Sequence, residues 1–451
     1  MEPDTFIIKS AECHIRVKML LSNLPRPMRT SSAYRRASNQ PYPRKIQHHE
    51  HPRDYNALLK AEFSFRQPLY QAVSAAWGGA GNLVLSPVVL LLSLGGVYVN
   101  SSGETEDELA RALRWTRGKE AFRRGAEDLL AALVIPRCHI GYKMSLTSLI
   151  FKREGEGERE REGEDDNPYA RIADLFQATP APAPLACPSL ARRHMNDAVD
   201  RGTKGRMSDL VPEGWVAEEA RLVAVSGLYL RGFSMPGFWR YATVFREFWT
   251  GVDTCRRVPM LHTRGDFLTY RHPELRAGFL VLVYPEGMYM LLIVPEEANG
   301  LASLEAALTP QLVRRAIMKI EPRHTLVAVP KMLLDQTRDY TEVMEHLGVR
   351  TLCDPALCQL TGGREGTRLD HLIHRAIMPL DEKSSKHETQ DVQEVMKEPD
   401  AHFLADRPFH WQVIHYHTST LLLQGRVTDP AAATQRQQFR GHAANSQEGR
   451  E

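Results

Sequence analysis

The feature that most constrains the fold is a pair of apolar runs separated by a turn, GFLVLVYPEGMYMLLIVP, at residues 278–295. Val, Ile, Leu and aromatic residues fill both runs, and Pro285, Glu286 and Gly287 stand between them. Apolar runs of this kind on either side of turn-forming residues predict a β-hairpin. Further strands are predicted at residues 222–230, 325–331 and 371–380, with a final pair around Thr418 and Ser419.

The first half of the chain favours helices instead. Helices are predicted at residues 63–77, 87–99 and 189–200, with another after a capping box formed by Thr105 and Glu108. Helices that come first and strands that dominate later indicate an α+β fold, with helices packed on large mixed and antiparallel sheets. The longest apolar stretch, at residues 83–99, is interrupted by polar residues and glycines, so it predicts a buried helix rather than a membrane span.

Several polar segments cannot contribute to this core. Residues 1–58 are rich in Arg, Pro, Ser and His and are predicted to be a disordered basic arm. Residues 152–166, KREGEGEREREGEDD, are of low complexity and predict a solvated loop insertion. Residues 431–451 predict a polar tail, which leaves 59–430 as one domain.

Composition and motifs argue against several functions. The net charge of +2 is too small to favour nucleic acid as a partner, and phosphate-binding loops and hydrolase motifs are absent from the sequence, so we expect no enzyme and no cofactor. Cys353 and Cys358 lack a second ligand pair at zinc spacing, and His415 with His417 favours a hydrogen-bonded pair over a metal pair, so no metal site is predicted. Asn100 begins the sequence Asn-Ser-Ser, a candidate glycosylation site if the chain is secreted.

Five motifs in order along the chain resemble those of the serpin family. They are NLVLSPVVLLLSLGGV (residues 82–97), TKGR (203–206), VAVPK (327–331), FLADRPF (403–409) and LLLQGRVTDP (421–430). The resemblance covers residues 60–430 and implies a single serpin-type domain with an exposed reactive-centre-like loop at residues 381–401. Ser226 departs from the family, which usually has asparagine there.

Within the serpins, the sequence is most similar to the colligin-type collagen-binding heat-shock serpins (clade H). LYQAV (residues 69–73), SPVVLLLSLGGV (86–97) and the residues Pro259 to His262 carry this likeness. It implies a chaperone of the secretory pathway that recognises Arg-containing triple-helical procollagen. A serpin-type inhibitor of serine proteases is the alternative, and a secreted binding module with another ligand is a third.

The hinge of the loop favours the chaperone over the inhibitor. In inhibitory serpins the cleaved loop inserts into a sheet, so alternate hinge side chains enter the core and have to be small. The equivalent residues here are Ser385, Lys386, His387, Glu388 and Thr389. Burial of an unpaired charge costs several kcal/mol on order-of-magnitude scales, so we expect that the loop does not insert and that no protease is trapped.

The resemblance also implies binding residues. Asp406 falls where the collagen-binding branch has an acidic residue that pairs with an arginine of collagen, and Leu404 and His402 would share its face of a strand. His262 and His374 match histidines of that branch and are candidates for a switch that releases collagen as the pH falls from about 7.4 to about 6. The endoplasmic reticulum lumen is the expected location. An extracellular location is the alternative, because the sequence ends in QEGRE rather than a retrieval signal and begins without a clear signal peptide.

Overall fold

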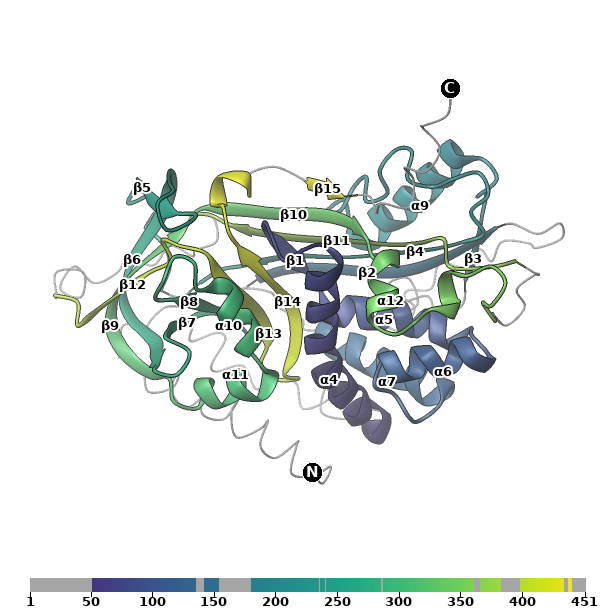
Figure 1. The fold of residues 1–451 in the computed structure, drawn as a ribbon, viewed down its shortest axis with the longest axis horizontal. Helices are drawn as coiled ribbons and strands as arrows, with labels where there is room; N and C mark the ends of the chain where they lie inside the picture. The colour runs from purple at the N-terminus through teal and green to yellow at the C-terminus, as the bar shows by residue number, and fades with distance from the viewer. Residues whose placement is uncertain are drawn as a thin grey trace.

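Two β-sheets, one of six strands and one of nine, organise the protein, with helices on their faces (Figure 1). The computed structural model describes residues 51–134, 142–153, 180–234, 236–239, 241–284, 287–360, 366–382, 398–433 and 437–439. This α+β arrangement confirms the predicted fold class.

The helices include two short 3₁₀ turns, labelled η. They are α4 (Pro52–Ala76), α5 (Pro87–Val99), α6 (Gly103–Ala112), α7 (Lys119–Val134), α9 (Pro188–Thr203), α10 (Leu301–Ala307), α11 (Pro310–Ile317), α12 (Thr341–His346), η2 (Thr351–Cys353) and η4 (Pro430–Ala432).

The six-stranded sheet has the strand order β15-β10-β11-β4-β2-β3. Its members are β2 (Tyr142–Arg153), β3 (Ala181–Ala183), β4 (Leu222–Gly232), β10 (Met332–Asp339), β11 (His371–Leu380) and β15 (Gln437–Phe439). Neighbours β4 and β11 run parallel, whereas β2 with β4 and β10 with β11 are antiparallel.

The nine-stranded sheet has the order β1-β14-β13-β8-β7-β6-β9-β12, and β5 pairs with β6 beside this path. Its members are β1 (Leu83–Leu85), β5 (Val244–Trp249), β6 (Cys255–His272), β7 (Ala277–Tyr284), β8 (Met288–Pro295), β9 (Glu321–Pro330), β12 (Ala401–Leu404), β13 (Phe409–His415) and β14 (Thr420–Val427).

The core has one layer on each face of the six-stranded sheet. Leu372 and Ala376 of β11 belong to the main cluster with α4, α5 and α7, whereas Ile373 and Ile377 belong to the cluster under α9. This alternation follows from the two-residue period of a strand. Helix α5 lies inside the main cluster, buried from Pro87 to Tyr98, because it is apolar on every face.

The structure confirms most of the predicted elements and moves some bounds. The hairpin is β7 and β8, the strand at 371–380 is β11, and the final pair is β13 and β14. Helix α4 begins at Pro52, so residues 52–58 are helical and not part of an arm; residues 1–50 lie outside the described residues. Likewise Lys152 and Arg153 end β2 instead of beginning a loop insertion, whose residues 154–166 are also outside the described residues.

The C-terminal residues also differ from the predicted polar tail. Residues 430–432 form η4, and residues 437–439 form β15, which pairs parallel with β10. The predicted capping box is wrong as well, because Thr105 and Glu108 lie inside α6. Their side chains bind the segment around η2 instead: the Thr105 hydroxyl contacts that of Thr351 at 2.9 Å, and Glu108 accepts the backbone N–H of Thr351 at 2.9 Å.

Candidate functional site

The candidate site is the junction of β4 and β11 in the middle of the six-stranded sheet, together with the loop that follows β11. We call this junction the seam. It consists of seven parallel residue pairs, from His371 opposite Val223 to Ile377 opposite Tyr229. Among the described residues, β4 also pairs with β2 and β11 also pairs with β10, both antiparallel, so the seam is where each strand meets a neighbour that runs in the same direction.

A buried polar cluster, here called the polar lock, holds the seam from the inner side. The Nε2 atom of His374 on β11 accepts the backbone N–H of Ser86 at 3.1 Å. Its Nδ1 atom is 3.0 Å from the hydroxyl of Ser226 on β4. Because Nε2 accepts, Nδ1 carries the proton of the neutral ring and donates to Ser226. The polar lock therefore joins both strands of the seam to the N-terminus of α5.

Charge is excluded from the polar lock. Burial lowers the pKa of His374 to about 3. Protonated Nε2 would point its own N–H at that of Ser86 and lose an acceptor. The predicted switch at His374 between pH 7.4 and 6 does not fit this position, since the ring stays neutral throughout that range. Burial also lowers the pKa of His262, whose Nδ1 lies 3.0 Å from the carbonyl oxygen of Met260.

The loop that follows β11 is anchored where it leaves the sheet. Asp381 accepts from Arg231 of β4 at 2.8 Å, and Glu382 accepts from Lys331 at 2.9 Å and from Thr243 at 2.7 Å. At the other end, the Asp400 N–H donates to the carbonyl oxygen of His324 at 2.8 Å, one residue before β12 begins. The hinge residues 385–389 lie outside the described residues.

The three predicted collagen contacts lie together at β12. His402 is exposed, Leu404 is half-buried and Asp406 follows the strand. Asp406 already has an internal cation, because its Oδ1 lies 2.9 Å from Nε of Arg407. An external arginine would have to compete with this neighbour.

Other predicted features have simpler roles. The side-chain amide of Asn100 donates to the carbonyl oxygen of Gly96 at 2.8 Å, which ties it to the end of α5. Cys353 and Cys358 are free thiols, and His415 is 2.8 Å from the Thr418 hydroxyl. Among the residues that the structure describes, no group of three His, Cys, Asp or Glu side chains could hold a metal ion. None of the described helices is long and apolar enough to cross a membrane.

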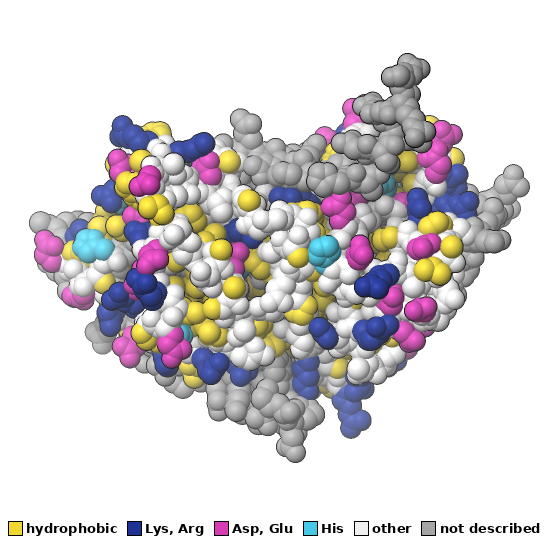
Figure 2. Space-filling model, in the orientation of Figure 1, with side chains coloured by type: hydrophobic (Ala, Val, Ile, Leu, Met, Phe, Trp, Pro, Cys, Tyr) yellow, Lys and Arg dark blue, Asp and Glu magenta, His cyan; other side chains and the backbone are white. Residues whose placement is uncertain are grey.

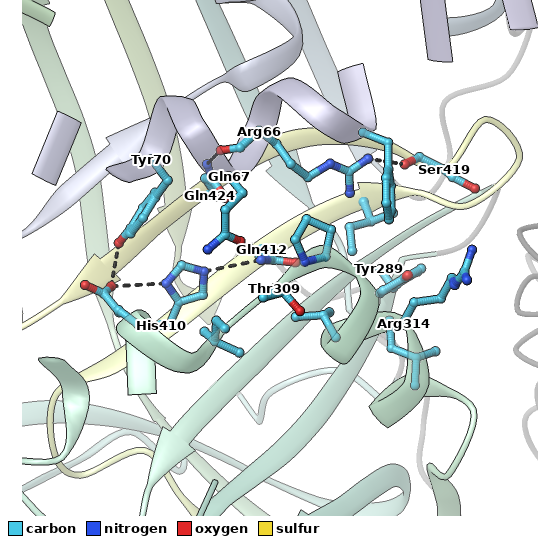
Figure 3. A pocket seen from close by; sticks show the side chains of 17 residues that line it. Arg66, Gln67, Tyr70, Tyr289, Thr309, Arg314, His410, Gln412, Ser419 and Gln424 are labelled. Carbon is cyan, nitrogen blue, oxygen red and sulfur yellow. Dashed lines mark hydrogen bonds and ion pairs between the residues drawn. The ribbon is translucent and has the colours of Figure 1, made fainter. Parts of the chain in front are cut away.

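A small cavity of about 60 Å³ lies between α4, α11, β13 and β14, and no residue of the seam lines it (Figure 3). Glu305 at its edge accepts from Tyr70 at 2.5 Å, from His410 at 3.1 Å and from Arg426 at 3.1 Å. Burial alone would raise the pKa of Glu305, but these partners, His410 first, lower it below its ordinary value. The cavity has room for only a few water molecules, so we interpret it as part of the packed, hydrogen-bonded interior and not as a ligand site.

Sequence reasoning singled out His374 but missed its partners. It noted Ser226 only as a departure from the family, and it missed the link to Ser86. A serine and a histidine at matching positions of neighbouring strands were the available signal. Their pairing depended on the order of strands in the sheet, which the sequence does not display.

The fold is that of several solved structures. Human thyroxine-binding globulin matches with a TM-score of 0.71 and 18% identity, over 85% of this chain and 100% of that one. Uncleaved ovalbumin matches with a TM-score of 0.69 and 18% identity, over 83% of this chain and 100% of that one.

Sequence relatives carry the names of protease inhibitors. The chain is 26% identical over 372 residues to alpha-1-antiproteinase S of Cavia porcellus, which covers 81% of this chain and 89% of that protein. It is 25% identical over 368 residues to the protein Z-dependent protease inhibitor of Homo sapiens, with 78% of each covered. It is 26% identical over 364 residues to the leukocyte elastase inhibitor of Bos taurus, with 78% of this chain and 94% of that protein covered.

These relatives overturn the prediction of a non-inhibitory collagen chaperone. That prediction depended on a few short motifs and on the charged hinge, whereas the relatives match over most of the chain. The collagen contacts at Asp406, Leu404 and His402 and the pH-dependent release of collagen lose their basis with it.

The match to a family model is broader than any single motif. The model of the serpin (serine protease inhibitor) family matches residues 60–430, far more than half of the chain. The described part of this range contains the seam, the polar lock and both ends of the loop. The chain belongs to the serpin family.

Proposed function

We propose that the protein inhibits a serine protease by inserting its cleaved loop into the seam. The observation that carries the proposal is the parallel pairing of β4 and β11, with the loop leaving directly from the C-terminal end of β11. A segment that folds back from β11 runs antiparallel to it, and therefore antiparallel to β4 as well. One parallel ladder is exchanged for two antiparallel ones, which are slightly more stable per residue.

The names of the relatives support the same function. Three of them are called an antiproteinase, a protease inhibitor and an elastase inhibitor. The loop contains several peptide bonds that serine proteases of different specificity could cleave, since Val395, Met396 and Lys397 follow one another. Small, large apolar and basic side chains suit different specificity pockets of serine proteases, so the target class is a matter for experiment.

The charged hinge slows insertion in this proposal without preventing it. Alternate residues of an inserted strand face the main core, so either Lys386 and Glu388 or His387 and Asp391 become buried. Desolvation of those groups raises the barrier to insertion, and slow insertion gives the protease time to complete hydrolysis. We therefore expect more than one molecule of inhibitor to be consumed for each protease trapped.

The test uses trypsin, chymotrypsin and pancreatic elastase with the full chain. We expect a one-to-one complex that survives SDS with at least one of them, and a higher melting temperature after cleavage of the loop. Two variants separate the possible faces: Lys386→Ala with Glu388→Ala, and His387→Ala with Asp391→Ala. The pair that enters the core should raise the yield of complex, and the other pair is its matched control.

The proposal fails if no protease forms such a complex and loop cleavage leaves the melting temperature unchanged. A chain that is cleaved without gaining stability does not insert its loop. Equal yields from both alanine pairs would show that the hinge does not limit insertion.

A further inference from the structure

Exposed hydrophobic side chains gather on one short segment of the protein. The structure describes seven exposed large hydrophobic residues, and five of them lie between residues 241 and 252. We call these five the β5 patch: Tyr241, Val244, Phe245, Trp249 and Val252. Tyr241 is 98% exposed and Phe245 is 62% exposed. Exposed apolar side chains that share one surface mark interaction sites. Phe245 and Trp249 share such a surface, because both line one hollow.

The local fold explains why these side chains are in water. Strand β5 pairs with β6 and with no other strand in the part of the chain that the structure describes. Within the strand, Phe248 is buried in the main core, whereas Val244 through Glu247 and Trp249 are exposed. Of the β5 side chains, only Phe248 belongs to the core, and the rings of Phe245 and Trp249 are each partly exposed to water.

Both ends of the loop are bonded to the segment that carries the β5 patch. The hydroxyl of Thr243 donates to Glu382, where the loop begins. The backbone N–H of Trp249 donates to the carbonyl oxygen of Asp406 at 2.7 Å, shortly after the loop ends in β12. A protein that engages the loop at residues 383–397 would consequently lie next to the β5 patch.

A hollow of about 490 Å³ connects the patch to the end of the loop. Its lining includes apolar side chains and charges of both signs: Phe245, Trp249, Leu404, Arg246, Arg257, Glu247 and Asp406. Side chains from β5, β6 and the end of β12 thus surround one recess. Figure 2 shows hydrophobic, Lys or Arg, and Asp or Glu side chains together at the upper left, where Figure 1 places β5.

The chemistry of this surface fits a protein partner with carboxylates. Tyrosine, tryptophan, phenylalanine and arginine are the residues enriched at protein–protein interfaces and at their energetic centres. Arg246 and Arg257 are exposed, and the exposed Glu247 lies opposite Arg257 in the pairing of β5 with β6. Because Asp406 is already paired with Arg407, the two arginines outnumber Glu247 and the recess keeps a net positive charge. Arg256, also exposed, pairs with Asp429 at 3.1 Å.

We propose that the β5 patch is a docking surface for the target protease, outside the protease's active-site cleft. The inference rests on the proposed function, since the occupant is the enzyme that the loop engages. The patch would contact an apolar ridge of the protease bordered by Asp or Glu side chains. Its effect is on recognition: it raises the rate at which the correct protease meets the loop, before any cleavage occurs.

The experiment measures the second-order rate constant of trapping for the protease identified with the wild type. We expect Tyr241→Ser with Phe245→Ser, and separately Arg246→Glu with Arg257→Glu, to lower it at least tenfold. The number of inhibitor molecules consumed per protease should stay unchanged, because insertion follows docking. The charge-reversed variant should also lose most of the salt dependence of the rate. Leu190→Ser with Leu357→Ser is the matched control, because these are the two exposed large hydrophobic residues outside the patch in the described part of the chain, and it should behave as wild type.

A second readout keeps this test separate from the proposed function. Proteases whose catalytic serine is replaced by alanine bind without being trapped, so calorimetry with the same panel reports docking alone. Weaker binding by the patch variants than by the control supports the docking surface even if trapping fails. Equal binding, or no binding to wild type, overturns it. Loss of a wild-type dimer in the patch variants, with protease binding unchanged, would assign the surface to a second copy and also overturn it.

Discussion

The seam and the β5 patch are opposite exceptions to the usual distribution of side chains: the seam has polar groups in the interior, and the β5 patch has apolar groups on the surface. The seam buries polar groups: His374 is 1% exposed and Ser226 is fully buried. The β5 patch leaves aromatic rings in water. A buried polar group is costly when it loses its partner, whereas an exposed apolar group becomes favourable when something covers it. Substitutions in the seam should therefore change the stability of the protein. Substitutions in the β5 patch should change the binding of a partner.

The largest expected loss of stability comes from an ion pair of β11, on the face of the six-stranded sheet that packs against α9. Arg375 of β11 donates to Asp335 through two nitrogens at 2.8 Å each, and both side chains are buried. Asp335→Ala leaves the guanidinium buried without its carboxylate, so we expect a loss of about 3–5 kcal/mol in the free energy of unfolding, measured by urea denaturation.

An exposed ion pair provides the control for this first variant. Glu120→Ala removes a partner of Arg123, at 2.7 Å on the surface of α7, and should cost less than about 1 kcal/mol. Similar losses in the two variants would contradict the claim that burial makes the seam sensitive.

The polar lock should show the next largest effect. Ser226→Ala removes the acceptor of the His374 Nδ1–H and leaves that donor buried and unpaired. We expect about 1–3 kcal/mol of destabilisation by the same measurement. Ser226→Thr keeps a hydroxyl at the site and should retain more of the stability; if alanine is tolerated as well as threonine, the lock does not hold the seam.

A pH series should show the neutrality of His374. Its pKa is about 3 in the folded protein and about 6.5 in an unfolded chain. Below pH 6.5 the unfolded state binds a proton that the folded state refuses, so stability falls as the pH falls. The slope from this one group is about 1.4 kcal/mol per pH unit between about pH 6 and pH 4. Urea denaturation of wild type and His374→Asn should differ in slope by one proton, and parallel profiles would mean that the native histidine is charged.

The smallest effect on stability is expected at the β5 patch. Tyr241→Ser and Phe245→Ser change side chains that contact water more than protein, so each should alter the unfolding free energy by less than about 0.5 kcal/mol. Together with the expected fall in trapping rate, this would separate a binding surface from a structural one. A loss above about 2 kcal/mol would instead place the rings in the stabilising structure.

Local patterns predicted the elements that depend on near neighbours. The hairpin β7–β8 followed from two apolar runs and a turn, and α5 from a proline-started apolar segment. The capping box failed because Thr105 and Glu108 bind η2, which is more than 240 residues away in sequence. The pattern S/T-x-x-E is local in sequence, but the hydrogen-bond partners of its two side chains are distant in sequence.

The candidate site was harder to predict for the same reason. Its chemistry depends on strand order: His374 meets Ser226 across 148 residues and Ser86 across 288. The β5 patch was missed because apolar residues in a strand suggest burial, and only the sheet topology shows that β5 has a single neighbour. The charges of the hinge are visible in the sequence, but the sequence does not show whether they prevent insertion of the loop or only slow it.

The six-stranded sheet ends on both sides in strands of three residues, β3 and β15, within the described part of the chain. Long free strand edges invite pairing with other molecules, and very short edge strands limit it. Residues 437–439, from the chain's own C-terminal region, occupy the β10 side. If the loop inserts as proposed, the sheet accepts a strand at its centre while its short edge strands limit pairing with other molecules. Removing residues 434–451 should consequently favour polymers that grow from β10.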